Sequence, residues 1–128
     1  MEWSQTYPGS ASMVPVARAF VRAMLDDCPR QRDAELIVTE LVANSLRYTP
    51  SGDGGEVTVT VTAEPGRARI AVHDSGDGRQ WHPVHGIPEE EDDHGRGLSV
   101  VYAYADRVGH DADANGQTMW AELTWTEQ

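Results

Sequence analysis

Apolar and polar residues alternate along this chain with two different periods, and these periods divide it into strands and helices. Residues 56–64 alternate strictly, with valine at every second position and threonine between, which is typical of a half-buried strand. Residues 67–73 repeat the alternation after Pro65-Gly66, so the two segments are expected to form a hairpin. Shorter patterns of the same kind predict three further strands, at residues 2–8, 107–111 and 117–126.

Helical spacing of apolar residues marks three other segments. The first is predicted at residues 12–27, with Pro29 ending the pattern. A second helix is expected from residue 32 to residue 48, because Pro50 disfavours its continuation. A third is predicted at residues 97–105, where apolar side chains again recur at core spacing.

The order of these elements is strand, helix, helix, hairpin, loop, helix, hairpin. Helices separated from mostly antiparallel strands imply an α+β fold, a two-layer sandwich of a mixed, mostly antiparallel sheet with helices on one face. Residues 1–128 are expected to form a single domain. Between residues 75 and 94 no core pattern is visible, and the charge and glycine content of residues 79–94 predict mobility.

Charge and composition exclude several classes of function. The formal net charge of −11 argues against binding to nucleic acid or to an anionic membrane surface, although a basic protein partner is compatible with it. The single Cys28, the lack of a long apolar run and the absence of a signal-peptide pattern in the first fifteen residues favour a cytoplasmic location.

One stripe of the second predicted helix is polar. Glu40, Asn44 and Arg47 lie four and three residues apart, within roughly 60° of each other around the helix axis. Taken alone, this stripe is consistent with a solvated face on which Glu40 and Arg47 pair loosely. The same stripe would also present a carboxylate and an amide to a ligand.

A carboxylate and two glycines follow the central hairpin. Asp74 comes directly after the strand, and Gly76 and Gly78 would permit close approach of the backbone to a flat ligand. Asp74 is a candidate acceptor for an exocyclic amine. Two alternatives stay open, an ordinary acidic turn and a calcium loop, although His85 stands where a calcium loop beginning at Asp74 requires glutamate.

A third polar feature opens the last predicted helix. Gly95 and Gly97 would expose N–H groups that bind phosphate, and Arg96 adds a permanent cation. All ten basic residues are arginines, so phosphate-binding designs that need a lysine are excluded. Arginine, backbone N–H groups and a metal ion would therefore hold any phosphates.

Together these features resemble the Bergerat-fold ATP-binding superfamily of gyrase, histidine kinases and MutL-type proteins. Its N-box is similar to ELVANSLRYT, its adenine-binding glycine box to HDSGDG, and its phosphate-contacting box to HGRGLSVV. Its closing strand, where a threonine supports the adenine site, is similar to GQTMWAEL. The short length and the segments VPVARAFVRAML and VVYAYADRVG resemble the small anti-sigma-factor serine/threonine kinase branch.

The resemblance implies a role for each matching residue. Glu40 would be the catalytic base that takes a proton from the attacking hydroxyl, Asn44 the ligand of a phosphate-bridging Mg²⁺, and Asp74 the reader of the adenine amine. The other implied contacts are the base pocket at Gly76, Gly78 and Thr118, the phosphate end at Gly95, Arg96, Gly97 and Leu98, a phosphate or partner contact at Arg47, and a lid from Arg79 to His94.

The expected function is that of an ATP- and Mg²⁺-dependent kinase that phosphorylates an anti-sigma antagonist and sequesters a sigma factor. Many relatives carry lysine where Gln117 stands, and the phosphate box lacks the longer glycine run of histidine kinases. A nucleotide-gated partner switch with little or no kinase activity is therefore the alternative, and a metal-binding acidic protein is a third. Relatives of the kinase branch often dimerise, which leaves a homodimer open.

Overall fold

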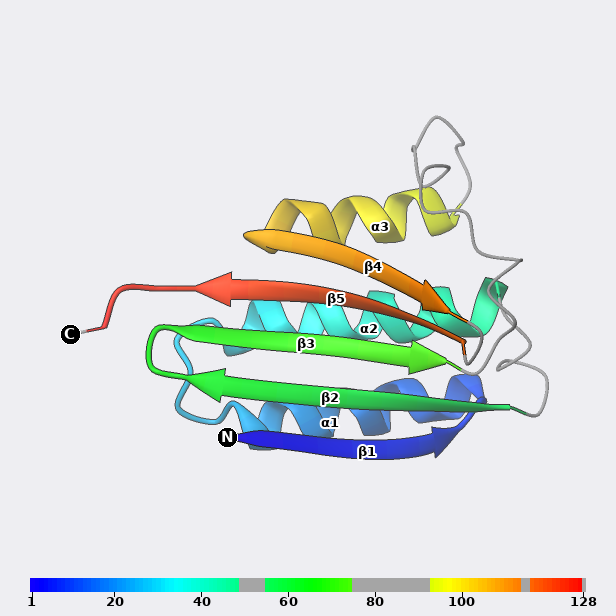
Figure 1. Ribbon diagram of the computed structural model, residues 1–128, viewed down its shortest axis with the longest axis horizontal. Helices are drawn as coiled ribbons and strands as arrows, with labels where there is room; N and C mark the ends of the chain where they lie inside the picture. The colour runs from blue at the N-terminus through cyan, green and yellow to red at the C-terminus, as the bar shows by residue number, and fades with distance from the viewer. Residues whose placement is uncertain (49–54, 75–92, 114–115, 128) are drawn as a thin grey trace.

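The computed structural model describes residues 1–48, 55–74, 93–113 and 116–127, and of residues 47–48, 93–98 and 113 the backbone alone. Its elements follow the predicted order (Figure 1). They are β1 (Glu2–Pro8), the 3-10 turn η1 (Ala11–Met13), α1 (Val14–Met24), α2 (Gln31–Tyr48), β2 (Glu56–Glu64), β3 (Arg67–Asp74), α3 (Asp93–Tyr104), β4 (Arg107–Asp113) and β5 (Gly116–Thr124).

The five strands form one sheet in the order β1-β2-β3-β5-β4. Every neighbouring pair of these strands is antiparallel, so the sheet among the described residues is not mixed. The last strand, β5, lies inside the sheet between β3 and β4. The α+β sandwich with helices on one face is confirmed.

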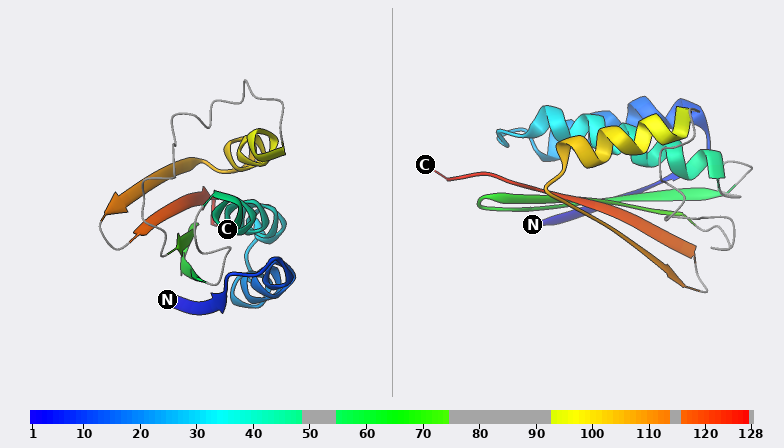
Figure 2. Two further views of the ribbon diagram at one scale, coloured as in Figure 1. Left: turned by 90° about the vertical axis from the view of Figure 1, so that its right-hand side faces the viewer. Right: turned by 90° about the horizontal axis from the view of Figure 1, so that it is seen from above.

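The three helices cover a single face of this sheet, and the other face is left without a helical layer (Figure 2). Helix α2 packs against α1, α3 and β3, which makes it the central element of the helical layer. The strictly alternating strands direct valine and isoleucine toward α2, as their period of two requires. The fully buried core residues with the largest side chains are Ile37, Leu41, Ile70, Leu123, Val21, Val38, Val57, Val59, Val61 and Val101.

Two helix boundaries differ by three residues or more from those predicted. Helix α1 ends at Met24, well before Pro29, because Leu25 leaves the helical conformation with φ −112° and ψ 35°. Helix α3 begins at Asp93, four residues earlier than predicted, so it includes Gly95 and Gly97. An acidic residue at a helix N-terminus is favoured by the helix dipole, and two glycines do not prevent helix formation.

The ends of four elements lie on the same side of the molecule. The C-terminal ends of α2 and β3 and the N-terminal ends of α3 and β5 all lie at the right-hand side of Figure 1. The polar features found in the sequence come from these same ends. Within the described part of the chain, no helix combines the length and apolar character needed to cross a bilayer.

Candidate nucleotide site

Within the described part of the chain, the buried polar side chains all lie at this edge. Among the residues whose side chains are described, the four buried polar ones are Asn44 (7% exposed), Ser45 (4%), Asp74 (4%) and Gln117 (2%). Two come from the last turns of α2, one from the end of β3 and one from the start of β5. Because burying a polar group without partners is costly, their gathering at one place marks a site.

Asp74 is the last residue of β3 and faces the helical layer. Its Oδ2 accepts a hydrogen bond of 2.7 Å from the hydroxyl of Ser45 on α2. Its Oδ1 lies 3.4 Å from the amide nitrogen of Gln117 on β5. The carboxylate is therefore fixed by donors from two other elements, as a recognition group needs to be.

Gln117 stands directly opposite Asp74 in the antiparallel register of β3 and β5. Its side-chain oxygen lies 3.4 Å from Nε2 of His110 on β4. A chain of polar side chains thus runs from His110 through Gln117 and Asp74 to Ser45. Burial lowers the pKa of His110, which favours the neutral imidazole at the end of this chain.

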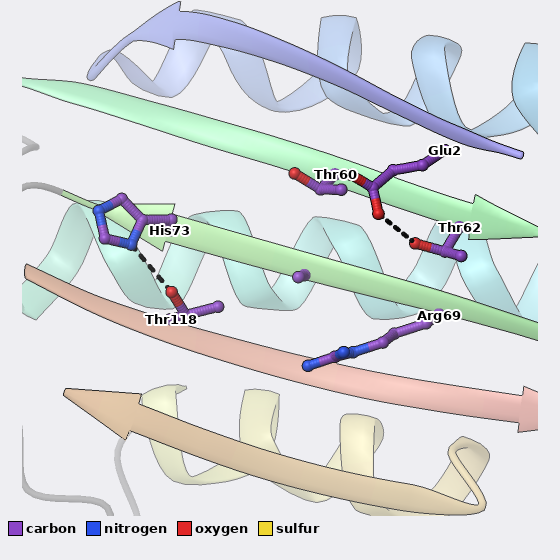
Figure 3. Close-up of a pocket in the computed structure, with 7 residues that line it drawn as sticks. Glu2, Thr60, Thr62, Arg69, His73 and Thr118 are labelled. Carbon is purple, nitrogen blue, oxygen red and sulfur yellow. Dashed lines mark hydrogen bonds between the residues drawn. The ribbon is translucent and has the colours of Figure 1, made fainter.

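Thr118 does not lie in this site, contrary to the role implied by the resemblance. Its hydroxyl is 2.9 Å from Nδ1 of His73, and both residues line a pocket of about 310 Å³ on the helix-free face of the sheet (Figure 3). Successive residues of a strand point to opposite faces. Gln117, one residue earlier, therefore occupies the inner position for which Thr118 was predicted.

Gly116 allows β5 to begin against the end of β3. Its φ is +137°, and a Cβ there would lie only 2.1 Å from the carbonyl oxygen of Asp74. Glycine adopts this backbone conformation without the steric penalty of other residues. The close approach brings the start of β5 to Asp74.

On α2, Asn44 is buried and Glu40, one turn earlier, is partly exposed. Ser45 directly follows Asn44 on α2, and its hydrogen bond to Asp74 joins this turn of the helix to the end of β3. The amide oxygen of Asn44 is a hard donor that suits Mg²⁺, which protein sites hold through few side chains together with phosphates. The described residues contain no group of three or more His, Cys, Asp or Glu that could hold a metal unaided.

The phosphate end of the site is described in its backbone only. Gly95 and Gly97 lie in the first turns of α3, and the side chains of Arg96 and Leu98 lie outside the described part. The same holds for the side chain of Arg47 on α2. Gly76, Gly78 and lid residues 79–92 are outside the described residues altogether, whereas residues 93 and 94 belong to α3 and not to a loop.

Sequence reasoning missed Ser45 and Gln117, although the pattern contained signals for both. Ser45 follows Leu41 by four residues, so it occupies a core-facing position on α2. Gln117 precedes Met119, Ala121 and Leu123 at every second position, which assigns it to the inner face of β5. A polar residue at a core-facing position next to a proposed site is the signal in each case.

Comparison with known proteins agrees with this geometry. Residues 8–125 match the family described as "Histidine kinase-like ATPase domain". Histidine protein kinase DivJ of Caulobacter vibrioides is 35% identical over 89 residues, which is 62% of this chain but only 15% of that kinase.

Two solved structures share the fold over almost the whole chain. The catalytic domain of histidine kinase ThkA, in a nucleotide-free form, gives a TM-score of 0.58 at 14% identity over 95% of both chains. A mycobacterial sensor histidine kinase, MprB, gives 0.56 at 18% identity over 100% of both. These relatives are histidine kinases and not anti-sigma-factor kinases. The family match covers nearly all of this chain, which therefore belongs to the histidine kinase-like ATPase domains, a family of ATP-binding domains.

Proposed function

We propose that this chain is a cytoplasmic, Mg²⁺-dependent protein serine/threonine kinase that phosphorylates an anti-sigma antagonist and binds a sigma factor. The observation that carries the nucleotide part is the buried Ser45–Asp74–Gln117 contact beside Asn44. The assignment to the anti-sigma-factor kinase branch rests on the short length of the chain and on the segments VPVARAFVRAML and VVYAYADRVG, which resemble that branch.

Adenine recognition is assigned to Asp74. Its carboxylate is an acceptor held in one orientation by Ser45 and Gln117, so it pairs with the exocyclic amine of adenine without first reorganising. A base that presents a carbonyl oxygen at the same position would set two acceptors against each other. Such mismatches of buried polar groups discriminate strongly between ligands.

Phosphoryl transfer is assigned to the residues of α2 and α3. Glu40 takes the proton of the attacking serine or threonine hydroxyl, whose oxygen forms the new bond to the terminal phosphorus while the bond to ADP breaks. Asn44 would hold the Mg²⁺ that neutralises phosphate charge. The N-terminal N–H groups of α3 and Arg96 would hold the terminal phosphate during this step.

The second candidate is a nucleotide-gated switch that binds its partner without transferring phosphate. Gln117 favours it, because many relatives carry lysine at this position and this chain has a neutral, buried amide there. Such a switch would need the contacts of Asp74 and Asn44 but not the base Glu40.

Incubation with ATP labelled in the terminal phosphate distinguishes the two. The chain is mixed with Mg²⁺ and the antagonist protein encoded nearest to it, and label on the antagonist is measured for wild type, Glu40→Gln and the exposed-residue control Glu64→Gln. The kinase proposal expects transfer that is lost only in Glu40→Gln. Intact ATP in a stable complex, unaffected by Glu40→Gln, would establish the switch instead.

A further inference from the structure

One arginine at the far end of the molecule connects three elements that carry the nucleotide site. Arg30 directly precedes α2, and its Nη2 donates a hydrogen bond of 2.6 Å to the carbonyl oxygen of Tyr104, the last residue of α3. Its Nη1 donates one of 3.0 Å to the carbonyl oxygen of Thr124, the last residue of β5. A single guanidinium therefore joins the start of α2 to the ends of α3 and β5.

Two carboxylates hold this guanidinium in place. Nη1 of Arg30 lies 2.8 Å from Asp106, in the turn between α3 and β4, and Nε lies 2.9 Å from Asp33 on α2. Asp106 also accepts a hydrogen bond of 2.7 Å from the backbone N–H of Thr124. That backbone N–H, together with the Arg30 guanidinium, lowers the pKa of Asp106, so the contact is charged over the physiological range.

The three joined elements lead to the site at the opposite edge. The start of α2 and the ends of α3 and β5 lie at the left of Figure 1, and the opposite ends of these elements lie at the right, on the side of the candidate site. Helix α2 carries Asn44 and Ser45, and β5 begins with Gly116 and Gln117. Helix α3 begins with the phosphate box, about 18 Å from Tyr104 for twelve residues of α-helix.

We propose that Arg30 is a positioning residue for phosphate binding, acting by fixing the C-terminal end of α3 against α2 and β5. This rests on the proposed role of the α3 N-terminus in holding phosphate. A helix moves as a rigid rod. Releasing the C-terminal end of α3 therefore lets the N–H groups at its N-terminus tilt away from the phosphates, which Asn44 is proposed to contact through Mg²⁺. Adenine recognition depends on the separate contact between α2, β3 and β5, which Ser45, Asp74 and Gln117 make directly.

The chain supplies a matched control for the loss of an inter-element arginine. Arg22 on α1 makes two hydrogen bonds to Glu35 on α2, of 3.2 and 3.0 Å, and among the described residues its guanidinium donates to no group of α3 or β5. Arg22→Gln removes an arginine–carboxylate contact between two elements from the same central helix, but it removes no contact to a carbonyl oxygen of α3 or β5. Arg30→Lys keeps the positive charge but lacks the planar fork that reaches two carbonyl groups at once.

The test compares the affinities of Mg²⁺-ATP and of adenosine, each followed by NMR titration of the full chain. Arg30→Gln and Arg30→Lys are expected to weaken ATP binding about fivefold or more, which is a typical size for a coupling through packed elements. The affinity for adenosine should change less than about twofold. Arg22→Gln should leave both affinities within about twofold of wild type. If Arg30→Gln does not fold, Arg30→Lys alone decides.

Other results would overturn either the role of Arg30 or the proposed phosphate site. Equal weakening of ATP and adenosine in the Arg30 variants, or no change in either, would mean that Arg30 only stabilises the fold. Failure of the wild type to bind ATP more tightly than adenosine would instead overturn the proposed phosphate site, which separates that failure from the failure of the role of Arg30.

Discussion

The two faces of the sheet differ most where β3 and β5 run side by side. On the helix-covered face, Asp74 and Gln117 are buried and face each other across the register. On the open face, their chain neighbours His73 and Thr118 form a hydrogen bond in a solvent-accessible pocket. Both pairs are polar, but only the first is buried. An unmade hydrogen bond costs most when the polar group is buried.

The rest of the open face resembles an ordinary solvated sheet. Ser4 pairs with Thr60 through their hydroxyls at 2.8 Å, and the Arg69 guanidinium lies 4.5 Å from the centre of the Trp120 ring. Cross-strand pairs of this kind each contribute about 0.2–1 kcal/mol to sheet stability. Polar side chains in this sheet therefore indicate a ligand site only where they are buried and need hydrogen-bond partners, which is the case on the helix-covered face.

Asp74→Asn should have the largest effect of any single change on nucleotide binding. It replaces a buried acceptor by an amide that also presents donors to the adenine amine, and ATP affinity is expected to fall about a hundredfold, or about 3 kcal/mol. His73→Gln, one residue away on the open face, should leave ATP affinity unchanged. Calorimetric titration of both variants measures the difference, and equal affinities for the two would remove the distinction between the faces.

Gly116→Ala should destabilise the fold by about 3 kcal/mol, since alanine is strained at its backbone conformation and its Cβ meets the backbone of Asp74. Gly109→Ala on the open face meets the Trp120 ring at 2.1 Å, but that ring can move, so about 1–2 kcal/mol is expected. Urea unfolding measures both. A smaller loss for Gly116→Ala than for Gly109→Ala would contradict the close approach of β5 to β3.

Gln117→Ala and Thr118→Ala compare adjacent residues on opposite faces. Gln117→Ala leaves Asp74 without one of its donors and should weaken ATP binding by about 1–2 kcal/mol. Thr118→Ala removes only the His73 contact and should change ATP affinity by less than about 0.5 kcal/mol. The reverse result would restore Thr118 to the adenine pocket.

The smallest predicted effect is a dependence of stability on pH at His110. Burial lowers its pKa in the folded state, so the unfolded chain, whose histidine titrates near about 6.5, takes up the proton first as pH falls. The free energy of unfolding should therefore decrease below that pH, until the folded state is protonated too. Urea titrations across this range should show a shallower decrease for His110→Gln, and an unchanged slope would exclude His110 as the cause.

The sequence predicted elements well wherever one face of an element was uniformly apolar. Strand β2 begins and ends at the predicted residues, because strict alternation leaves a single register. The sequence could not predict the insertion of β5 between β3 and β4, since strand order depends on long-range pairing. The earlier start of α3 was missed because glycines were read as preceding the helix.

The sequence identified several residues of the candidate site but not the contacts that support them. The sequence singled out Asp74 and Asn44, and the structure brings both to the same edge, where they are buried; their roles toward a ligand stay predictions. The resemblance placed the β5 contact at Thr118, although the alternation of Met119, Ala121 and Leu123 assigns the inner position to Gln117. The core-facing position of Ser45 could be predicted from the pattern, but its contact with Asp74 depends on the packing of α2 against β3.

The central claim is that Asp74 reads the exocyclic amine of adenine, and competition between ATP and inosine triphosphate tests it most directly. Inosine triphosphate carries a carbonyl oxygen in place of that amine and is otherwise closely similar. Wild type should prefer ATP by about tenfold or more, and Asp74→Asn should abolish or reverse the preference. Equal affinity of the wild type for both nucleotides would contradict the account.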